Sequence, residues 1–562
     1  METQPQSTSS EAAGPQLFES GSADGLLSRP DDVLVLSPAV TLTLAGNALL
    51  VSGSDKSARK SASKAHRVCG FGGPAHEQSP SSIDYYNILW AEVTEDLGHL
   101  RIDFAEQTGD HYLEAHNVAY AIDPPAPAES SGSISDAISS WVERLLDRSY
   151  GGAARRKRAW VLVNPHAGPG GADKVWHKQV KPIFDAARMP MTVVRTSYSG
   201  EAVTLAKDLN IDDYDIAIPC SGDGLPHEVF NGLAQRPDAR RALSKIAVCH
   251  IPCGSGNAMS CNLYGTHRPT LAALAIVKGL PTPLDLISVT QGNKRTISFL
   301  SQALGMIADI DINTEHLRWM GASRFTYGFL VLAMQKKVYP CDIAIKVEIE
   351  HKDEVKGHYR QQITQASSGA DEAAQKGGGV DGTRSAARQS QSSSPPPSDP
   401  DSDDGQGLPP LKYGTVMDKL PDGWQLVPYE KLGNFYCGNM AYMAPDMNFF
   451  SAALANDGLM DLVITNGDIS LAKNIGLQLS IDSGHFFDSP LVMYRKVSAY
   501  RLIPRPQATK CCISIDGEAL PYEPFQAEVH QGLGLTLSKK GVFDAPGPLN
   551  WDKVTNTDRL MA

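Results

Sequence analysis

Two hydrophobic patterns divide the chain into regions of different fold class. Between residues 32 and 125, apolar and polar residues alternate in short runs such as Val40–Leu44, which predicts a β-rich module. From residue 158, short apolar runs such as Ala159–Val163 alternate with segments of helical periodicity. Strands that alternate with helices indicate βαβ units, so we expect an α/β domain with a parallel sheet at residues 158–290.

The second half of the chain is β-rich apart from one interruption. After about residue 284, short apolar runs recur at 295–300, 342–350, 434–443, 459–465, 497–503, 511–515 and 533–537. Residues 361–410 break this pattern, because they hold a Ser/Pro run and then an acidic cluster. Such a composition cannot bury enough apolar surface to fold, so we predict a disordered insertion there. The flanking parts, 291–360 and 411–543, are expected to form one β domain.

The remaining segments are polar or rich in small residues. Residues 1–31 are predicted to be disordered, residues 126–157 to form a linker with a short helix, and residues 544–562 to form a tail. The spacing within the β-rich extension at 32–125 fits a PH-like adaptor and a purely structural extension equally well.

Composition narrows the class of protein. The chain has 562 residues, a formal net charge of −12 and 42% hydrophobic residues, which suits two or three globular domains. The acidic balance argues against nucleic acid as a partner. None of the nine cysteines forms a CxxC pair or a zinc-type spacing, and no signal peptide opens the sequence. We therefore expect a cytoplasmic protein that associates only peripherally with intracellular membranes.

Three glycine-rich turns in the α/β region follow one design, in which a strand leads through glycines and small polar residues into a helix. We call residues 164–171, 221–232 and 252–258 the first, second and third glycine turns. In doubly wound sheets such turns meet at the carboxyl edge of the strands. Glycine allows backbone N–H groups to approach an anion, and a helix N-terminus adds about half a positive charge. The three turns together predict a nucleotide-phosphate site.

Common nucleotide-binding motifs do not fit these turns. The chain has no G-x-x-x-x-G-K-[ST] sequence, and the third glycine turn has Met259 where a dinucleotide fingerprint needs glycine. The sequence therefore excludes a P-loop and a dinucleotide-binding fingerprint.

The second glycine turn carries the candidate chemistry. Asp223 stands between two glycines at a helix start, where an acid can accept a proton from an attacking hydroxyl group or orient a magnesium–phosphate complex. An N-cap carboxylate is an equally good interpretation from spacing alone. His227 and Glu228 follow one turn later and fit capping or surface roles as well as roles in the site.

The three glycine turns read N-P-x-x-G, S-G-D-G-x-x-H-E-V-x-N-G and P-x-G-S-G-N-A. In this order they resemble the diacylglycerol kinase catalytic domain and, within it, the sphingosine kinases. Residues 283–289, residues 305–311 and the Asp-Gly-Glu motif at 516–518 resemble the same branch. The resemblance covers roughly residues 159–340 and 426–537.

This resemblance implies a kinase in which ATP binds between the α/β domain and an antiparallel β-sandwich that holds the lipid. Asp223 would be the general base, and Asp311 would bind the substrate amine and hydroxyl group. Met306, Ile307, Ile310 and Phe325 would line the pocket for the lipid chain. The nucleotide would contact Asn164, Pro165, Thr196, Ser221, Gly222, Gly224, Glu228, Gly254, Ser255, Gly256, Asn257, Arg318, Arg324, Asp516, Gly517 and Glu518.

The resulting expectation is an ATP- and Mg²⁺-dependent kinase that phosphorylates the primary hydroxyl group of a sphingoid long-chain base. No residue is assigned as a direct metal ligand. Asp311 is an acid in an apolar stretch, and a buried carboxylate needs a partner such as the substrate ammonium group. The alternatives are a diacylglycerol or ceramide kinase and, in a different class, an inactive lipid-binding scaffold.

Overall fold

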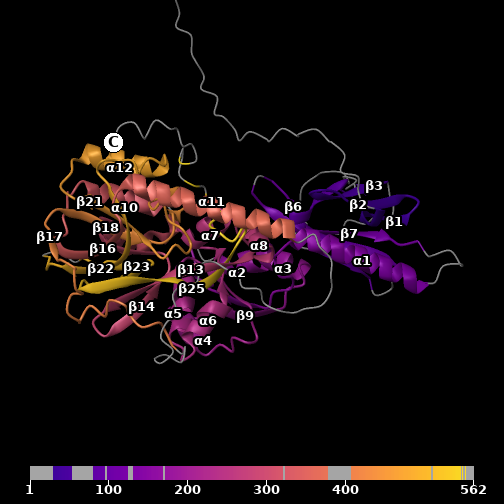
Figure 1. Ribbon diagram of the computed structural model, residues 1–562, viewed down its shortest axis with the longest axis horizontal. Coiled ribbons are helices and arrows are strands. Elements are labelled where there is room, and N and C mark those ends of the chain that lie inside the picture. Colours follow the sequence, from indigo (N-terminus) through magenta and orange to yellow (C-terminus); the bar gives the residue numbers. More distant parts are fainter. Residues whose placement is uncertain are drawn as a thin grey trace, which may run out of the picture.

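The computed structural model describes residues 30–53, 80–94, 98–109, 111–123, 131–168, 171–320, 323–376, 407–507, 511–545, 547 and 551. The β-rich extension lies at one end of the molecule, the antiparallel sheet domain at the other, and the α/β domain between them (Figure 1). Residues 1–29 of the predicted disordered N-terminal segment and most of the predicted tail at 544–562 lie outside the described residues.

The N-terminal extension contains two small antiparallel sheets and a helix. One sheet has the order β1-β2-β3-β4 and the other β5-β6-β7. The elements are η1 (Pro30–Asp32), β1 (Val33–Ser37), β2 (Val40–Leu44), β3 (Ala48–Ser52), β4 (Ser82–Asp84), η2 (Tyr85–Asn87), β5 (Ile88–Val93), β6 (His99–Gln107), β7 (Leu113–Ala121) and α1 (Ser131–Tyr150). The β-rich expectation is thus confirmed, whereas the PH-like interpretation stays a prediction.

Helix α1 belongs to this extension rather than to a linker. The sequence predicted a short helix at about 135–146, but α1 is longer at both ends. Its apolar residues Ile138, Trp141, Val142 and Leu145 recur at helical spacing and are buried, because this face packs on β5. The Trp141 indole N–H also donates to the Asp32 carbonyl oxygen at 3.2 Å.

Buried polar contacts fix the extension to the α/β domain. Arg188 donates to carboxylate oxygens of Glu92 at 2.5 Å and Asp103 at 3.0 Å. The Lys278 ammonium donates to the carbonyl oxygens of Ile88 at 2.5 Å and Ser149 at 2.9 Å. Burial lowers the pKa of Lys278 well below its usual range. Apolar side chains of the two parts also form one continuous core, so the extension and the α/β domain pack as a single body.

The α/β domain has the predicted parallel sheet, ordered β9-β8-β10-β11, with β12 also beside β10. Two residues, 249 and 250, separate β11 from β12. The elements are β8 (Ala159–Val163), α2 (Ala172–Val175), η3 (Trp176–Val180), α3 (Lys181–Ala186), β9 (Met191–Arg195), α4 (Glu201–Lys207), β10 (Ile216–Ser221), α5 (Gly224–Ala234), α6 (Ala239–Lys245), β11 (Ala247–Val248), β12 (Ile251–Pro252), α7 (Ala258–Tyr264) and α8 (Pro269–Val277).

The second domain is antiparallel, as expected, and eleven of its described strands belong to one hydrogen-bonded sheet, while the finer β-sandwich description stays a prediction. Strand β22 keeps the sheet continuous, because it pairs with β21 over its first part and with β25 farther along. Its strands are β13 (Leu280–Gln291), β14 (Lys294–Ser298), β15 (Ser301–Gly305), β16 (Cys341–Ile349), β17 (Val427–Tyr429), β18 (Leu432–Gly438), β21 (Met460–Asn466), β22 (Met493–Pro504), β23 (Ile513–Ile515), β24 (Glu518–Leu520) and β25 (Phe525–Ser538).

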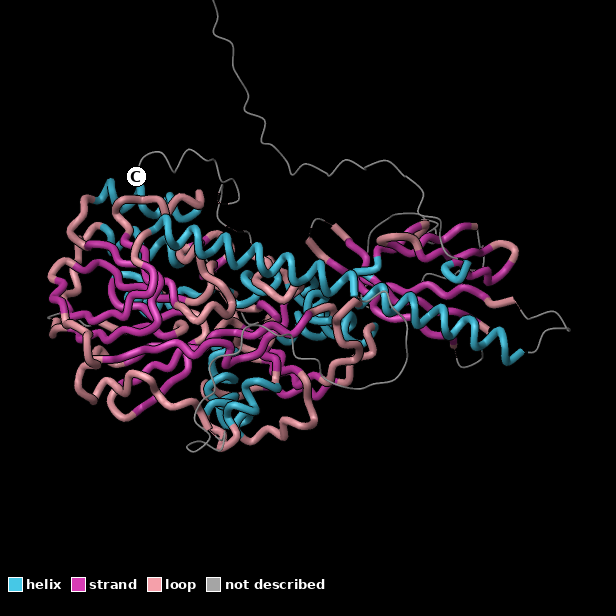
Figure 2. Tube along the Cα trace, in the orientation of Figure 1, coloured by secondary structure: helices cyan, strands magenta, loops and turns pink. Residues whose placement is uncertain are grey.

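Helices and a hairpin cover one face of this sheet (Figure 2). They are α9 (Met306–Asn313), η4 (Glu315–Met320), α10 (Ser323–Ala333), α11 (Lys352–Lys376), the hairpin β19 (Tyr442–Ala444) and β20 (Met447–Asn448), and α12 (Leu471–Asp482). None of the helices that the structure describes is long and apolar enough to cross a membrane.

Helix α11 corrects the predicted insertion boundary. The disordered insertion was expected to begin at residue 361, but the helix continues to Lys376, and residues 377–406 lie outside the described part. Val355, Tyr359 and Ile363 recur every four residues, and Val355 is fully buried while Tyr359 packs edge-on against Trp551. The polar composition of the segment concealed this apolar stripe, because most of the helix surface faces solvent.

Candidate active site

The three glycine turns meet at the carboxyl edge of the parallel sheet and touch through their backbones. A Cβ atom added to Gly168 would lie 2.5 Å from the Cys253 carbonyl oxygen, and one added to Gly254 would lie 2.4 Å from the Gly222 Cα atom. No side chain fits at these contacts, which is why each turn needs glycine there. These close backbone contacts confirm the expectation that the three glycine turns meet at one edge of the sheet.

Asn257 fixes the shape of the third glycine turn. Its side-chain oxygen accepts from the Gly254 N–H group at 2.8 Å, and its side-chain amide donates to the Gly254 carbonyl oxygen at 2.9 Å. Asn257 has a φ of +58°, a conformation that asparagine adopts more readily than most residues. Its side chain is therefore committed to holding the turn open.

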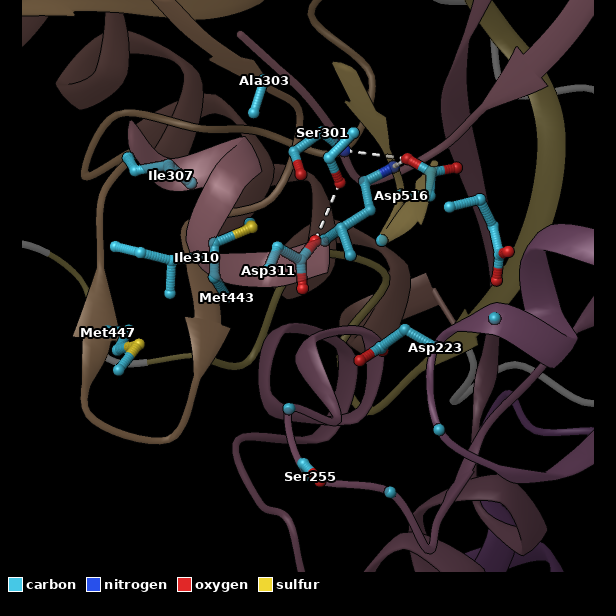
Figure 3. A pocket seen from close by; sticks show the side chains of 18 of the residues that line it. Asp223, Ser255, Ser301, Ala303, Ile307, Ile310, Asp311, Met443, Met447 and Asp516 are labelled. Carbon is cyan, nitrogen blue, oxygen red and sulfur yellow. Dashed lines mark hydrogen bonds between the residues drawn. The ribbon is translucent and has the colours of Figure 1, made fainter. Parts of the chain in front are cut away.

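The Asp223 carboxylate caps a helix, but not its own. Its two oxygens accept from the backbone N–H groups of Ala258 and Met259, each at 3.0 Å, at the start of α7. Its own helix, α5, has no side-chain cap. The side chain remains 14% exposed and faces the cavity, so the capping and catalytic interpretations are compatible (Figure 3).

Glu228 caps a second helix beside the site. One carboxylate oxygen accepts from the Gly200 N–H group at 3.0 Å and the other from the Ala202 N–H group at 3.1 Å, at the start of α4. The loop that these bonds hold in place begins at Thr196, whose N–H group donates to the Val163 carbonyl oxygen at 3.0 Å. Glu228 therefore orders a loop that lines the cavity.

Asp516 joins the two domains. Its carboxylate accepts from the Ser298 hydroxyl at 2.6 Å and from His227 Nδ1 at 2.8 Å. The backbone N–H groups of Phe299, Leu300 and Ser301 donate to it at 2.9–3.0 Å. A carboxylate has about four lone-pair directions, so these bonds saturate it.

Because all its acceptor positions are used, the Asp516 carboxylate has a structural role in addition to lining the cavity. His227 shares this role, because it is the α/β-domain residue that donates to Asp516. We call the His227–Asp516 contact the joint. Burial disfavours the charged form of His227, but the Asp516 hydrogen bond and charge outweigh it and raise the pKa of the imidazole. Sequence reasoning did not identify this pair, since the two residues are far apart in the chain.

Asp311 lies on α9, across the cavity from Asp223 (Figure 3). The Ser514 hydroxyl donates to its Oδ2 at 2.8 Å, and Arg324 Nη2 lies 3.5 Å from its Oδ1. Arg324 is 8% exposed and lines the same cavity. The side chains of Arg318 and Phe325 lie outside the described residues.

One cavity of about 460 Å³ connects these groups. It is polar where the glycine turns meet and apolar under α9, α10 and α12. Of the predicted residues it is lined by Asn164, Thr196, Ser221, Gly222, Asp223, Gly224, Glu228, Gly254, Ser255, Gly256, Met306, Ile307, Ile310, Asp311, Arg324, Asp516, Gly517 and Glu518. Pro165 and Asn257 do not line it, although both belong to the turns that do.

Comparison with known proteins agrees with this geometry. Residues 158–289 match the diacylglycerol kinase catalytic domain, and residues 32–151 match a domain of unknown function. Sphingoid long chain base kinase 4 of Schizosaccharomyces pombe is 35% identical over 71% of this chain and 79% of its own length. The chain belongs to the sphingoid long chain base kinase family.

Two further relatives extend the comparison. Sphingoid long chain base kinase 5 of Saccharomyces cerevisiae is 36% identical over 72% of this chain, and the match spans 62% of that protein. Human sphingosine kinase 1 is 28% identical over 66% of this chain and 88% of its own length. The match at residues 32–151 includes α1, in agreement with the packing of that helix.

The sphingoid base kinase fold completes its cavity with residues that the motifs did not reveal. The apolar and aromatic ones lie in or next to α10, β18, the β19–β20 hairpin, β21 and α12: Phe329, Tyr436, Met443, Met447, Phe449, Val463, Leu477, Ile481 and Phe486. Polar residues of β18, β21 and α12 line the cavity as well: Asn434, Thr465, Asn474 and Gln478. Hydrophobicity alone does not separate the apolar ones from an ordinary core.

Strand β18 shows how one strand serves both the core and the cavity. Phe435 points into the core of the sheet, where its ring packs 4.7 Å from that of Tyr500. Tyr436, the next residue, points to the opposite face and lines the cavity. Side chains alternate between the faces of a strand, so a strand buried on both faces shows no polar alternation in its sequence.

Proposed function

We propose that this chain transfers the γ-phosphoryl group of ATP to the primary hydroxyl group of a sphingoid long-chain base. The observation that carries the proposal is the single cavity, which joins a phosphate-type polar end at the glycine turns to an apolar end under α9, α10 and α12. A nucleotide and a long-chain lipid would then meet at Asp223. Family membership supports the same reaction.

The polar end suits phosphoryl transfer. Glycine turns with no side chains at their contacts present backbone N–H groups to phosphate oxygens. Asp223 would take the proton of the attacking hydroxyl group while the phosphorus–oxygen bond to that group forms and the bond to ADP breaks. Positioning and charge neutralisation supply most of the rate in such reactions, and a general base contributes about 10²–10⁴-fold.

Asp311 would recognise the ammonium group of the base. It lies between the two ends of the cavity, held by Ser514 on one side and by Arg324 on the other. A sphingoid ammonium group offers a charge partner that diacylglycerol and ceramide lack. This difference favours a sphingoid base over those two substrates.

A magnesium ion would accompany ATP. Mg²⁺ is usually held by phosphates, water and one or two carboxylates. Glu518 fits this requirement, because it lines the cavity and its Oε1 lies 3.0 Å from the position of a Cβ added to Gly224, at the start of α5. When bound, the ion would neutralise charge on the transferred phosphate.

A radiolabelled ATP assay tests the reaction. Sphinganine, phytosphingosine, diacylglycerol and ceramide are offered in parallel micelles to the wild type and to Asp223→Asn. We expect label in a sphingoid-base phosphate, and none with the variant, which still binds ATP. Label only in phosphatidate would overturn the substrate assignment, and no label in any lipid would favour the scaffold alternative.

A membrane surface is the proposed source of the lipid. Large apolar side chains are exposed on α10 and α12, which contact each other and line the apolar end of the cavity. They are Tyr327 and Val331 on α10, Met334 just after its end, and Leu471, Ile475 and Leu479 on α12. An exposed apolar patch at the mouth of a lipid cavity suits peripheral binding to the cytoplasmic face of intracellular membranes.

Vesicle co-sedimentation tests this surface. The double variant Met334→Glu/Leu479→Glu should lose binding to phosphatidylcholine–phosphatidylserine vesicles while it retains turnover of substrate in micelles. Met417→Glu is the matched control, since Met417 is 69% exposed outside α10 and α12. Equal vesicle binding by all three proteins would contradict the proposal.

A further inference from the structure

His250 is a fully buried histidine directly behind the proposed general base. It lies between β11 and β12, with a side chain that is 0% exposed. Its Nε2 lies 3.0 Å from the Ser221 carbonyl oxygen. Since a carbonyl oxygen can only accept, Nε2 carries the hydrogen and Nδ1 is left with a lone pair.

Among the residues that the structure describes, that Nδ1 atom has no hydrogen-bond partner, although it is buried. The nearest acidic oxygen is Oδ1 of Asp223, at 3.9 Å. Leaving a buried acceptor without a hydrogen bond is unfavourable, because the atom has lost its contact with water. A lone pair that faces an ionised carboxylate gains nothing, whereas a proton on Asp223 would satisfy both groups once the two atoms close from 3.9 Å to hydrogen-bond distance.

The resting protonation state follows from burial. Burial lowers the pKa of His250, and the Asp223 charge offsets this only in part, so the imidazole is neutral at neutral pH. The catalytic carboxylate and the imidazole lone pair therefore face each other without a proton. A proton that Asp223 takes up during turnover would therefore allow Asp223 to donate a hydrogen bond to His250 Nδ1.

The other titratable groups around His250 do not compete for this proton. The Tyr264 hydroxyl accepts from the His250 backbone N–H group at 3.3 Å, and burial raises the pKa of that hydroxyl well above its usual range. Burial likewise raises the pKa values of the Cys249 and Cys261 thiols to about 12. Burial lowers the pKa of Lys157, which lies near Cys249, to about 8.

We propose that His250 is a positioning residue that stabilises the protonated form of Asp223. This inference rests on the proposed role of Asp223 as the base. The lipid O–H bond breaks, the lipid oxygen bonds to the γ-phosphorus, and the electron pair of the broken phosphorus–oxygen bond leaves on ADP. The proton goes to the Asp223 carboxyl group, which donates it in a hydrogen bond to His250 Nδ1.

Two substitutions separate the ring nitrogens. His250→Gln keeps an amide donor for the Ser221 carbonyl oxygen but removes the acceptor at Nδ1. His250→Asn keeps an acceptor near the Nδ1 position and loses the distant donor. We expect His250→Gln to lower kcat about tenfold, which is a part of the roughly 10²–10⁴-fold that a general base contributes, with unchanged KM for ATP. The acidic limb of its kcat profile should move down by about one pH unit, because an unsupported carboxyl group holds its proton less tightly.

His250→Asn should keep the acidic limb near its wild-type position. A limb that stays unchanged in His250→Gln, with only thermal stability lowered, would overturn the inference and leave a packing role. If Asp223→Asn retained activity, the assignment of the base itself would fail, which is a distinct outcome.

Nuclear magnetic resonance of histidine ¹⁵N in the wild type provides a test that does not depend on how well the variants fold. We expect Nδ1 to be unprotonated at pH 7. Its resonance should shift in Asp223→Asn, because the new amide group can donate to it. A protonated Nδ1 in the wild type at pH 7 would overturn the inference.

Discussion

The two walls of the cavity are built in different ways. On the α/β side the wall is backbone, where glycine turns touch so closely that no side chain fits between them. On the other side the wall consists of side chains gathered from residues 306 to 486, carried by helices, strands and a hairpin. Asp516 connects the two walls by accepting from both domains.

The difference suits the proposed ligands, which are a nucleotide phosphate at the backbone wall and a lipid chain at the other wall. Phosphate oxygens need N–H groups at fixed positions, and a turn fixes them only if its backbone cannot shift. A hydrocarbon chain needs only apolar volume, which many combinations of side chains provide. The backbone wall should therefore respond sharply to small substitutions, and the lipid wall gradually to larger ones.

The largest expected effect concerns the connection between the walls. Asp516→Asn removes the charge that pairs with buried His227, and breaking a buried pair typically costs about 3–5 kcal/mol. Asparagine tolerates the φ of +52° at this position, so the backbone is not strained. Chemical denaturation should show the loss, whereas the exposed Glu518→Gln should leave stability unchanged. A loss below about 1 kcal/mol would show that the walls do not depend on this joint.

Gly254→Ala probes the backbone wall. The added Cβ would lie 2.4 Å from the Gly222 Cα atom, so the turns must move apart at a cost of about 1–3 kcal/mol. ATP affinity measured by calorimetry should fall at least about tenfold. Gly171→Ala is the matched control, because its Cβ would meet no atom within 4 Å. Equal ATP affinities of the two variants would contradict the expectation that the backbone wall responds sharply to small substitutions.

Met447→Trp probes the lipid wall. Met447 lies in the cavity near Ile310 (Figure 3), and a larger side chain there shortens the space for the hydrocarbon chain. We expect kcat/KM for a long-chain base to fall about tenfold, with a smaller loss for a shorter base and an unchanged KM for ATP. The exposed Met417→Trp serves as the control. A raised KM for ATP would contradict the separation of the walls.

The smallest expected effect is the pH dependence of the unfolding free energy that the His227–Asp516 pair contributes. The pKa of His227 is raised in the folded state, because the Asp516 contact outweighs the opposing effect of burial. Its stabilising contribution is thus complete below the unfolded pKa of about 6.5 and is lost as pH rises through the folded value. Urea unfolding between pH 6 and 9 should show a steeper decline for the wild type than for His227→Gln. Parallel curves would contradict this assignment.

Several site features were predictable because they are local. The strand at Ala159–Val163, the glycine turns and Asp223 follow from runs and spacings within a few residues, and the structure places these turns at one sheet edge. The family assignment, which rests on the order of the turns, is confirmed by the relatives. Helix α11 was missed because only one narrow stripe of it is apolar.

The partners of these residues were not predictable. No spacing indicates that Asp223 caps α7, that Asp516 accepts from His227, or that His250 stands behind the base. Each contact joins segments that meet only after the chain folds. A motif records which residues a turn requires, not what packs against it.

The sequence by itself determined the class of fold, the kinase family and the glycines of the phosphate wall, because backbone conformation and anion binding depend on residues close together in the chain. Only the tertiary structure decided which apolar residues line the cavity instead of the core, how eleven strands join into one sheet, and which buried histidine faces the Asp223 carboxylate. Those outcomes depend on packing between distant segments, which is set by the shape of the whole fold.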